Sequence, residues 1–150
     1  DITVAADHQI SAQFLYKWNT TYGQINCLKS FDDFLLISSA KGQVFVIYTG
    51  ISSDSEPNPL TIWSEVDNIC VNEFAIKTID TNSFEILFTK SDFVIICRMS
   101  ADIKGEDVTM NLKICRPELG LHRMPSTAIC SIVDSKYLLT SLDGRLIEIE

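Results

Sequence analysis

The sequence is 150 residues long, with 46% hydrophobic and 21% charged residues, and its formal net charge is -8. This length and composition are typical of one globular domain with a sizeable core, and they exclude disordered, collagen-like and coiled-coil chains. The acidic excess repels a phosphate backbone, so we do not expect direct binding to duplex DNA. No apolar run approaches the roughly 18 residues of a membrane span, and no signal segment opens the sequence, so no membrane partner is expected.

The five cysteines are spread along the chain, and none forms the close C-x-x-C pair of zinc ribbons and redox motifs. They are Cys27, Cys70, Cys97, Cys115 and Cys130. An odd number of widely spaced cysteines favours reduced, mostly buried thiols and therefore an intracellular compartment. We expect Cys27, Cys97 and Cys130 to be small apolar core residues in strands.

Along the chain, a short apolar strand, a tight polar turn and a second apolar strand recur as a unit. A weaker copy opens the sequence at residues 2–10. Three clear copies follow, with strands at residues 34–38 and 43–48, 84–88 and 93–97, and 137–141 and 145–149. These strands are rich in Val, Ile, Phe and Tyr, which favour buried strands. Each copy is therefore predicted to be a β-hairpin.

Glycine stands in the turns of two of these hairpins, as Gly42 and as Gly144 after Asp143. Glycine adopts the positive φ of hairpin turns without steric cost, and Asp-Gly between apolar runs is a strong hairpin signal. We predict that Gly42 and Gly144 hold these turns. We also predict that Asp143 caps its turn by accepting hydrogen bonds from backbone N–H groups.

Further apolar stretches flank the hairpins. Inner strands are predicted before the hairpins at residues 24–28, 74–79 and 127–132, and outer strands after two of them at residues 60–63 and 108–114. The polar connections at residues 50–59, 100–107 and 116–125 are expected to be surface loops, either solvated connectors or recognition loops on a rigid scaffold.

Four strands per unit, repeated about every 40 to 50 residues, are typical of β-propeller blades. We therefore expect an all-β, WD-repeat-like β-propeller with three to four blades, at about residues 1–23, 24–73, 74–126 and 127–150. A closed ring needs about four to eight blades. The chain is thus expected to be part of a larger propeller, or to pair its open edges with another protein.

The sequence contains no pattern for catalysis or cofactor binding. The two histidines, His8 and His122, lie in predicted turns without a partner for nucleophilic chemistry. No glycine-rich phosphate-binding motif is present in the sequence. We therefore predict no catalytic, cofactor-binding or metal-binding residues and no small-molecule substrate.

Two features of the sequence could instead serve recognition. A small basic patch could contact an acidic partner or one phosphate, and it consists of Lys113, Arg116, His122 and Arg123. Trp63, like Trp18, could be an aromatic anchor at an interface or could pack between blades. The basic patch and Trp63 are therefore the candidate interaction residues.

Five segments carry a resemblance to a known family through their common order and spacing. They are residues 36–42 (LISSAKG), 62–67 (IWSEVD), 90–97 (KSDFVIIC), 120–125 (GLHRMP) and 141–145 (SLDGR). From residue 34 onward, the sequence resembles the propeller domain of the delta-subunit family of transcription factor IIIC.

The resemblance implies a nuclear, non-enzymatic subunit that scaffolds transcription factor IIIC and supports RNA polymerase III transcription. Its partners would be the other subunits of that factor, and it would meet promoter DNA only through the complex. Some members of the family are also credited with histone acetyltransferase activity and zinc binding, but this sequence has neither an acetyl-coenzyme motif nor clustered Cys and His pairs. The alternatives are an adaptor propeller of a ubiquitin ligase, vesicle coat or nuclear pore, and a subunit associated with histone acetyltransferase activity.

Overall fold

The computed structural model describes residues 20–50, 59–90, 93–105, 107–120, 126–131 and 136–149. These residues form one short 3-10 turn, Thr20–Tyr22, and β-strands joined by turns. The chain is therefore all-β, as predicted. Among the described residues, no helix is long and apolar enough to cross a membrane.

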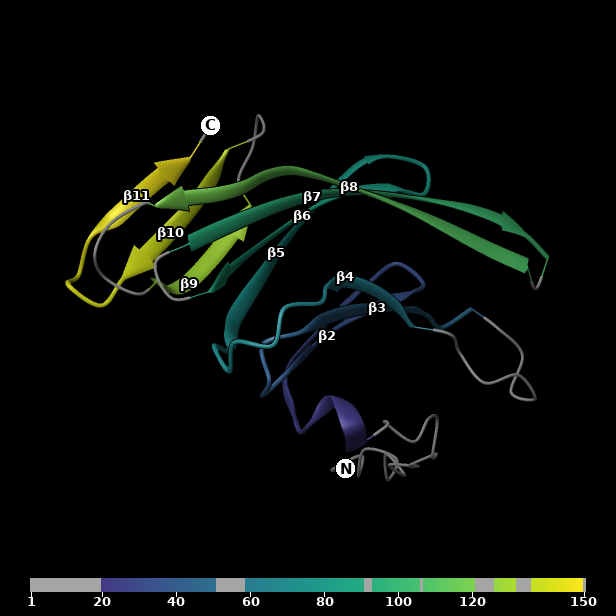
Figure 1. The fold of residues 1–150 in the computed structure, drawn as a ribbon. Helices are drawn as coiled ribbons and strands as arrows, with labels where there is room; N and C mark the ends of the chain where they lie inside the picture. The colour runs from purple at the N-terminus through teal and green to yellow at the C-terminus, as the bar shows by residue number, and fades with distance from the viewer. Residues whose placement is uncertain are drawn as a thin grey trace, which may run out of the picture.

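The described strands form three antiparallel sheets, and strand order within each sheet follows chain order (Figure 1). The first sheet contains β1 (Ile25–Phe31), β2 (Phe34–Ser39), β3 (Val44–Tyr48) and β4 (Leu60–Trp63). The second sheet contains β5 (Val71–Asp80), β6 (Ser83–Lys90), β7 (Phe93–Lys104) and β8 (Asp107–Gly120). The third sheet contains β9 (Ser126–Ser131), β10 (Tyr137–Ser141) and β11 (Leu146–Ile149). None of these sheets closes into a barrel.

The strand predictions from residue 24 onward are confirmed. The three hairpins are β2–β3, β6–β7 and β10–β11, each paired in antiparallel register. The predicted inner strands correspond to β1, β5 and β9, and the predicted outer strands to β4 and β8. The weaker copy at residues 2–10 lies outside the described residues, as do residues 51–58 of the first predicted loop.

The prediction of a loop at residues 100–107 is wrong. Strand β7 continues to Lys104 and β8 begins at Asp107, and these two residues face each other in the ladder. At the end of β7, apolar and polar residues alternate: Ala101 and Ile103 are half-buried, and Asp102 and Lys104 are exposed. A strand with one polar face has the composition of a loop, which explains the error.

The predicted loop at residues 116–125 is also wrong in its first half. Strand β8 continues to Gly120, and Leu119 and Gly120 pair with β7. Pairing with a long partner strand therefore extends β8 into a segment that reads as polar. Residues 121–125 lie outside the described residues.

Alternation along the strands places the second sheet between two cores. On β6, the side chains of Phe84, Ile86 and Phe88 are fully buried in the cluster shared with the first sheet. Leu87 points the other way and is buried with residues of the third sheet. Successive side chains of a strand point to opposite faces, so both faces of β6 must be apolar.

The larger core lies between the first and second sheets. Phe34 of β2 packs on Phe84 of β6 with ring centroids 5.4 Å apart, and Phe31 of β1 packs edge-on to the same ring at 4.9 Å. The smaller core joins Leu87 and Val94 of the second sheet to Leu139 of β10. Aromatic rings of this size contribute a large share of the hydrophobic stabilisation.

The first strands of neighbouring sheets lie beside each other. Asn26 of β1 donates from Nδ2 to the carbonyl oxygen of Val71 at the start of β5, at 2.7 Å, and Lys29 Nζ lies 3.6 Å from Glu73 Oε1. Strand β5 in turn contacts β9. The β7–β8 hairpin extends away from the third sheet (Figure 1), and its half-buried apolar side chains pack on the core shared with the first sheet. The sheets therefore approach one another along their first strands.

Candidate functional site

One buried basic residue joins the first and second sheets. Lys90 ends β6 and is only 3% exposed. Its Nζ donates to the Gly42 carbonyl oxygen at 2.7 Å and lies 2.7 Å from Asp67 Oδ2. The same Nζ lies 5.6 Å from the centroid of the Trp63 ring, within cation–π range. A charge this deeply buried requires such partners, so this cluster holds the β2–β3 turn against β6.

Asp67 supplies the negative charge of this cluster. Burial alone would raise the pKa of its carboxyl, but hydrogen bonds from Lys90 and from the Ile69 amide, with the Lys90 charge, outweigh burial and lower that pKa. The Ile69 amide donates to Asp67 Oδ1 at 2.9 Å. The carboxylate therefore stays ionised and fixes the connection between β4 and β5.

Trp63 contributes to this junction from the end of β4. Its ring is half-buried and lies edge-on to the ring of Phe88, with centroids 6.5 Å apart. Phe88 belongs to the second sheet, so the indole packs between two sheets. The packing role considered for Trp63 is thus seen in this contact, and its role as an anchor at an interface stays a prediction.

A second set of polar residues, four charged side chains, forms a row across the second sheet. The register aligns Lys77 of β5, Glu85 of β6, Arg98 of β7 and Lys113 of β8 side by side. Arg98 Nε donates to Glu85 Oε2 at 3.1 Å. Tyr137 of β10 donates from its hydroxyl to Glu85 Oε1 at 2.5 Å. Glu85 thus links the row to the third sheet.

The third sheet covers only part of this face of the second sheet. Its apolar residues pack on Leu87, Val94 and Ile96. Burial, followed by the Glu85 hydrogen bond and charge, raises the pKa of the Tyr137 phenol, which therefore remains a donor. The Tyr137–Glu85 bond marks the boundary, and beyond it no residue of the third sheet that the structure describes packs on the polar part of the face.

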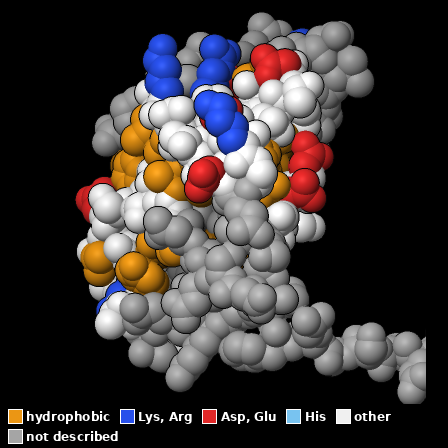
Figure 2. Space-filling view, turned by 90° about the vertical axis from the view of Figure 1, so that its right-hand side faces the viewer, with side chains coloured by type: hydrophobic (Ala, Val, Ile, Leu, Met, Phe, Trp, Pro, Cys, Tyr) orange, Lys and Arg blue, Asp and Glu red, His pale blue; other side chains and the backbone are white. Residues whose placement is uncertain are grey.

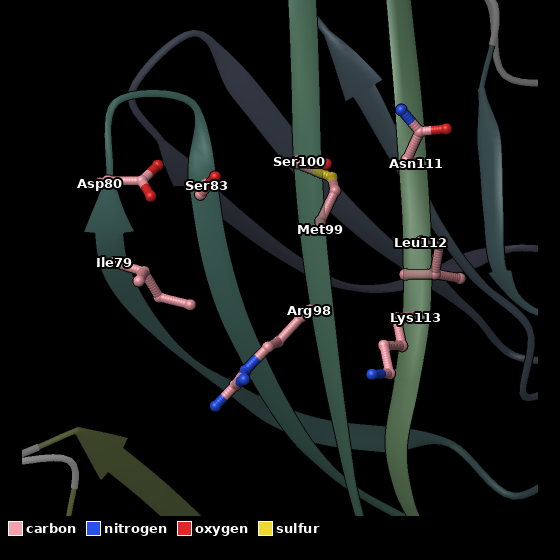
Figure 3. Close-up of a pocket in the computed structure, with 9 residues that line it drawn as sticks. All are labelled: Ile79, Asp80, Ser83, Arg98, Met99, Ser100, Asn111, Leu112 and Lys113. Atoms are coloured by element: carbon pink, nitrogen blue, oxygen red, sulfur yellow. The ribbon is translucent and has the colours of Figure 1, made fainter.

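An open pocket of about 360 Å³ lies on this uncovered part (Figure 3). Its lining mixes two basic residues, one acidic residue, small polar side chains and apolar groups: Ile79, Asp80, Ser83, Arg98, Met99, Ser100, Asn111, Leu112 and Lys113. Figure 3 shows the Arg98 and Lys113 side chains extending from neighbouring strands toward the same side of the sheet. Arg98 is also paired with Glu85, so part of the basic charge beside the pocket is offset.

The charged surface around the β7–β8 hairpin is mixed. Figure 2 views the side toward which this hairpin projects, and Lys and Arg side chains gather there at the upper edge with Asp and Glu side chains near them. Lys104 Nζ, for example, lies 2.7 Å from Asp102 Oδ2, with both side chains exposed. Exposed pairs of this kind contribute little to stability.

Of the predicted basic patch, the structure describes the side chain of Lys113 alone. Lys113 is exposed and lines the pocket beside Arg98. The backbone of Arg116 lies in β8 opposite Ile96, and its side chain lies outside the description. His122 and Arg123 lie outside the described residues.

The residues predicted to shape turns lie in the β2–β3 and β10–β11 turns. Gly42 has φ of 90° and Gly144 has φ of 80°. Asp143 accepts hydrogen bonds from the Ser141 hydroxyl and, at 3.4 Å, from the Arg145 amide. The Ser141 hydrogen bond is the main cause of the lowered pKa of the Asp143 carboxyl.

Cys27, Cys70 and Cys97 have described side chains, and none of these three cysteines is in a disulfide. Cys97 is fully buried in the larger core, as predicted, and Cys27 packs at its edge. Burial is the main cause of the raised pKa of the Cys27 thiol. Within the described part of the chain, no three His, Cys, Asp or Glu residues gather as metal ligands.

The sequence analysis did not predict the buried cluster around Lys90 or the row that contains Glu85 and Arg98. Lys90 lies between the predicted strands 84–88 and 93–97 and was therefore expected in their turn, but Thr89 and Lys90 belong to β6 and are buried. Lys90 continues the period-two pattern of Phe84, Ile86 and Phe88, so the signal was present in the sequence. The row containing Arg98 also follows from the hairpin register once β8 is paired with β7.

The described residues form an all-β protein of antiparallel sheets, with an open pocket of mixed lining on one face of the second sheet. The chain matches no known protein family, no curated protein and no solved structure.

Proposed function

We propose that the three sheets are blades of a β-propeller. The observation that carries this proposal is the approach of the sheets along their first strands, β1 to β5 and β5 to β9. Propeller blades are four-stranded antiparallel sheets arranged around a central channel. Two four-stranded sheets whose strands follow chain order, and a third sheet of three described strands in chain order, support this arrangement.

We further propose that the protein is a non-enzymatic, nuclear scaffold of transcription factor IIIC that acts through contacts with other subunits. The resemblance of five collinear segments to the delta-subunit family supports this assignment. The net charge of -8 favours protein contacts over direct promoter contacts, because it repels the phosphate backbone.

Affinity purification of the tagged protein from nuclear extract, followed by mass spectrometry, tests the assembly. The expected result is recovery of the other transcription factor IIIC subunits in stoichiometric amounts. Parallel purification from cells that express the tag alone is the control. Recovery of ubiquitin ligase, vesicle coat or pore components instead would transfer the scaffold role to that assembly and overturn the assignment to transcription factor IIIC.

The non-enzymatic part of the proposal has a test of its own. Purified protein incubated with histones and acetyl-coenzyme A is expected to transfer no acetyl groups above the uncatalysed background. Acetyl transfer that disappears on a single point substitution would contradict the proposal and favour a role associated with histone acetylation.

A further inference from the structure

We propose that the apolar side chains around the Lys90 cluster form a docking surface for a segment of a partner protein that carries large apolar residues flanked by lysine and arginine. This surface, called the junction surface below, consists of Trp63, Val66, Ile69 and Phe93. The inference rests on the proposed scaffold function, and it specifies the surface and the chemistry of one of its contacts.

Exposed apolar side chains are concentrated on one side of the sheets. Strands β2, β6 and β10 end on this side of the molecule, whereas β5 and β7 end on the opposite side (Figure 1). Most of the large apolar side chains that are exposed among the described residues lie on the first side: Ile25, Val66, Ile69, Phe93, Leu142 and Leu146. Leu28 and Ile114 lie within strands, and Ile79 lies on the opposite side, near the end of β5. Clustered exposed apolar groups mark interaction sites more often than scattered ones do.

The residues of the junction surface lie around one buried cation. Phe93 begins β7 and faces Lys90 in the ladder, so the two side chains lie on the same face of the sheet. The Trp63 ring lies 5.6 Å from Lys90 Nζ. Asp67 Oδ2 lies 2.7 Å from the same Nζ, and Asp67 Oδ1 accepts the Ile69 amide at 2.9 Å. The Lys90 cluster therefore holds strand β7 and the β4–β5 connection together at this surface.

The junction surface combines exposed apolar groups with a fixed base. Val66, Ile69 and Phe93 are exposed, and Trp63 is half-buried. Lys90 at the centre is buried and is paired with a carboxylate. Removing the exposed apolar area from water is favourable and leaves this ion pair intact. A surface that is already fixed also loses little conformational entropy when a partner binds.

The charge of the chain selects a basic partner. With a net charge of -8, the chain attracts a basic segment and repels an acidic one. Glu65 is exposed next to Val66, so it offers a carboxylate at the border of the junction surface. A lysine or arginine that flanks the apolar residues of the partner can pair with this carboxylate. A second copy of the chain carries the same negative charge, which disfavours self-association through this surface.

Fluorescence anisotropy of a fluorescein-labelled peptide of alternating leucine and lysine, titrated with the full chain, tests the junction surface. Ile69→Ser should weaken binding about three-fold to six-fold, since Ile69 is 38% exposed and the peptide would bury that apolar area. Ile79→Ser is the matched control: Ile79 is 49% exposed on the opposite side, and its substitution should change binding less than two-fold. Glu65→Gln should weaken binding about two-fold, because it removes an exposed carboxylate.

Three results would overturn the proposal while the circular dichroism of each variant stays unchanged. They are equal weakening by Ile69→Ser and Ile79→Ser, equal binding of an alanine–lysine peptide of the same charge, and tighter binding of a leucine–glutamate peptide. The second result would leave charge as the whole attraction, and the third would assign the surface to an acidic partner. Val66→Ser, at the most exposed position of the junction surface, replaces Ile69→Ser if that variant does not fold.

Photo-cross-linking in the purified assembly separates this proposal from the proposed function. Val66→benzoylphenylalanine should link the chain to apolar residues flanked by lysine or arginine in another protein, whereas Ile79→benzoylphenylalanine should not. Recovery of transcription factor IIIC subunits without any link from position 66 would overturn the junction surface and leave the scaffold role standing. A link to such a segment of a protein outside that factor would support the surface and overturn the assignment. A link between two copies of the chain would overturn the basic partner as the occupant.

Discussion

At the scale of single residues, Gly42 and Gly144 share a backbone conformation but differ in their surroundings. Their φ angles are 90° and 80°. A Cβ at Gly42 would overlap Asp67 Oδ1 and would lie 2.9 Å from both Ile69 O and Lys90 Nζ, whereas a Cβ at Gly144 would meet nothing within 4 Å. The first glycine is thus required by conformation and by space, the second by conformation alone.

We therefore expect Gly42→Ala to be more destabilising than Gly144→Ala. Gly144→Ala should lower the free energy of unfolding by about 1–2 kcal/mol, the usual strain of a non-glycine residue at positive φ. Gly42→Ala should cost at least about 2 kcal/mol more, because it also separates the Lys90–Asp67 pair. Urea denaturation of both variants measures the difference, and equal losses would contradict the close packing at Gly42.

The Asp67 carboxylate makes the free energy of unfolding depend on pH. Its pKa in the folded protein is below the ordinary value of 3.8, so the ionised form favours folding. This contribution is fully present above that ordinary value and is lost as the pH falls through the lower pKa of the folded protein. Stability falls in acid because the Asp67 carboxylate binds a proton more readily in the unfolded protein than in the folded one.

Asp67→Asn should therefore lower the free energy of unfolding by about 2 kcal/mol at neutral pH, since it leaves the buried Lys90 charge unpaired. The gap between wild type and variant should stay constant down to about pH 5 and narrow below about pH 4. Urea denaturation across this pH range measures it. Asp102→Asn is the control, with a loss of about 0.5 kcal/mol or less, because its pair with Lys104 is exposed. A gap that widens in acid would refute the role of Asp67.

At the scale of elements, β6 is the central strand because both of its faces are buried. Ile86 and Leu87 are neighbours in sequence, yet Ile86 faces the first sheet and Leu87 the third, and both are fully buried. The sequence predicted this strand from its apolar run. It did not predict that Lys90 ends the strand, because a lysine beside polar residues has the composition of a turn.

Alanine substitution on either face of β6 should be equally severe. Ile86→Ala and Leu87→Ala should each lower the free energy of unfolding by about 2–5 kcal/mol, the usual range for buried aliphatic residues. Leu146→Ala on β11 is the control, since that side chain is 67% exposed, and should cost less than about 0.5 kcal/mol. A small loss for Leu87→Ala alone would show that the third sheet is not packed on the second.

The β7–β8 hairpin shows the limit of element prediction. Its apolar residues alternate with polar ones, and Ser100, Asp102 and Lys104 made the segment resemble a loop. Pairing with a partner strand decides such a case, because the backbone hydrogen bonds are then satisfied whatever the side chains are. The same pairing places Arg98 beside Lys113.

At the scale of the whole molecule, net charge predicts weak binding to nucleic acid. A charge of -8 should prevent saturable binding of a promoter duplex below about 0.1 mM protein at physiological salt. Fluorescence anisotropy with a labelled transfer-RNA gene promoter duplex measures this, with a basic DNA-binding protein as the positive control. Tight, sequence-specific binding by this chain would overturn the scaffold proposal.

The sequence by itself determined the all-β class, the hairpins and the turn glycines, because strand formation follows local alternation and turns follow local backbone preference. Tertiary structure alone decided which polar groups meet. Lys90 binds the carbonyl of a residue 48 positions away, and Tyr137 binds Glu85 across 52 positions. Such contacts depend on how far one sheet covers the next, and that coverage leaves the Arg98–Lys113 pocket open. Packing between distant segments, unlike strand formation, leaves no periodic signal in the chain.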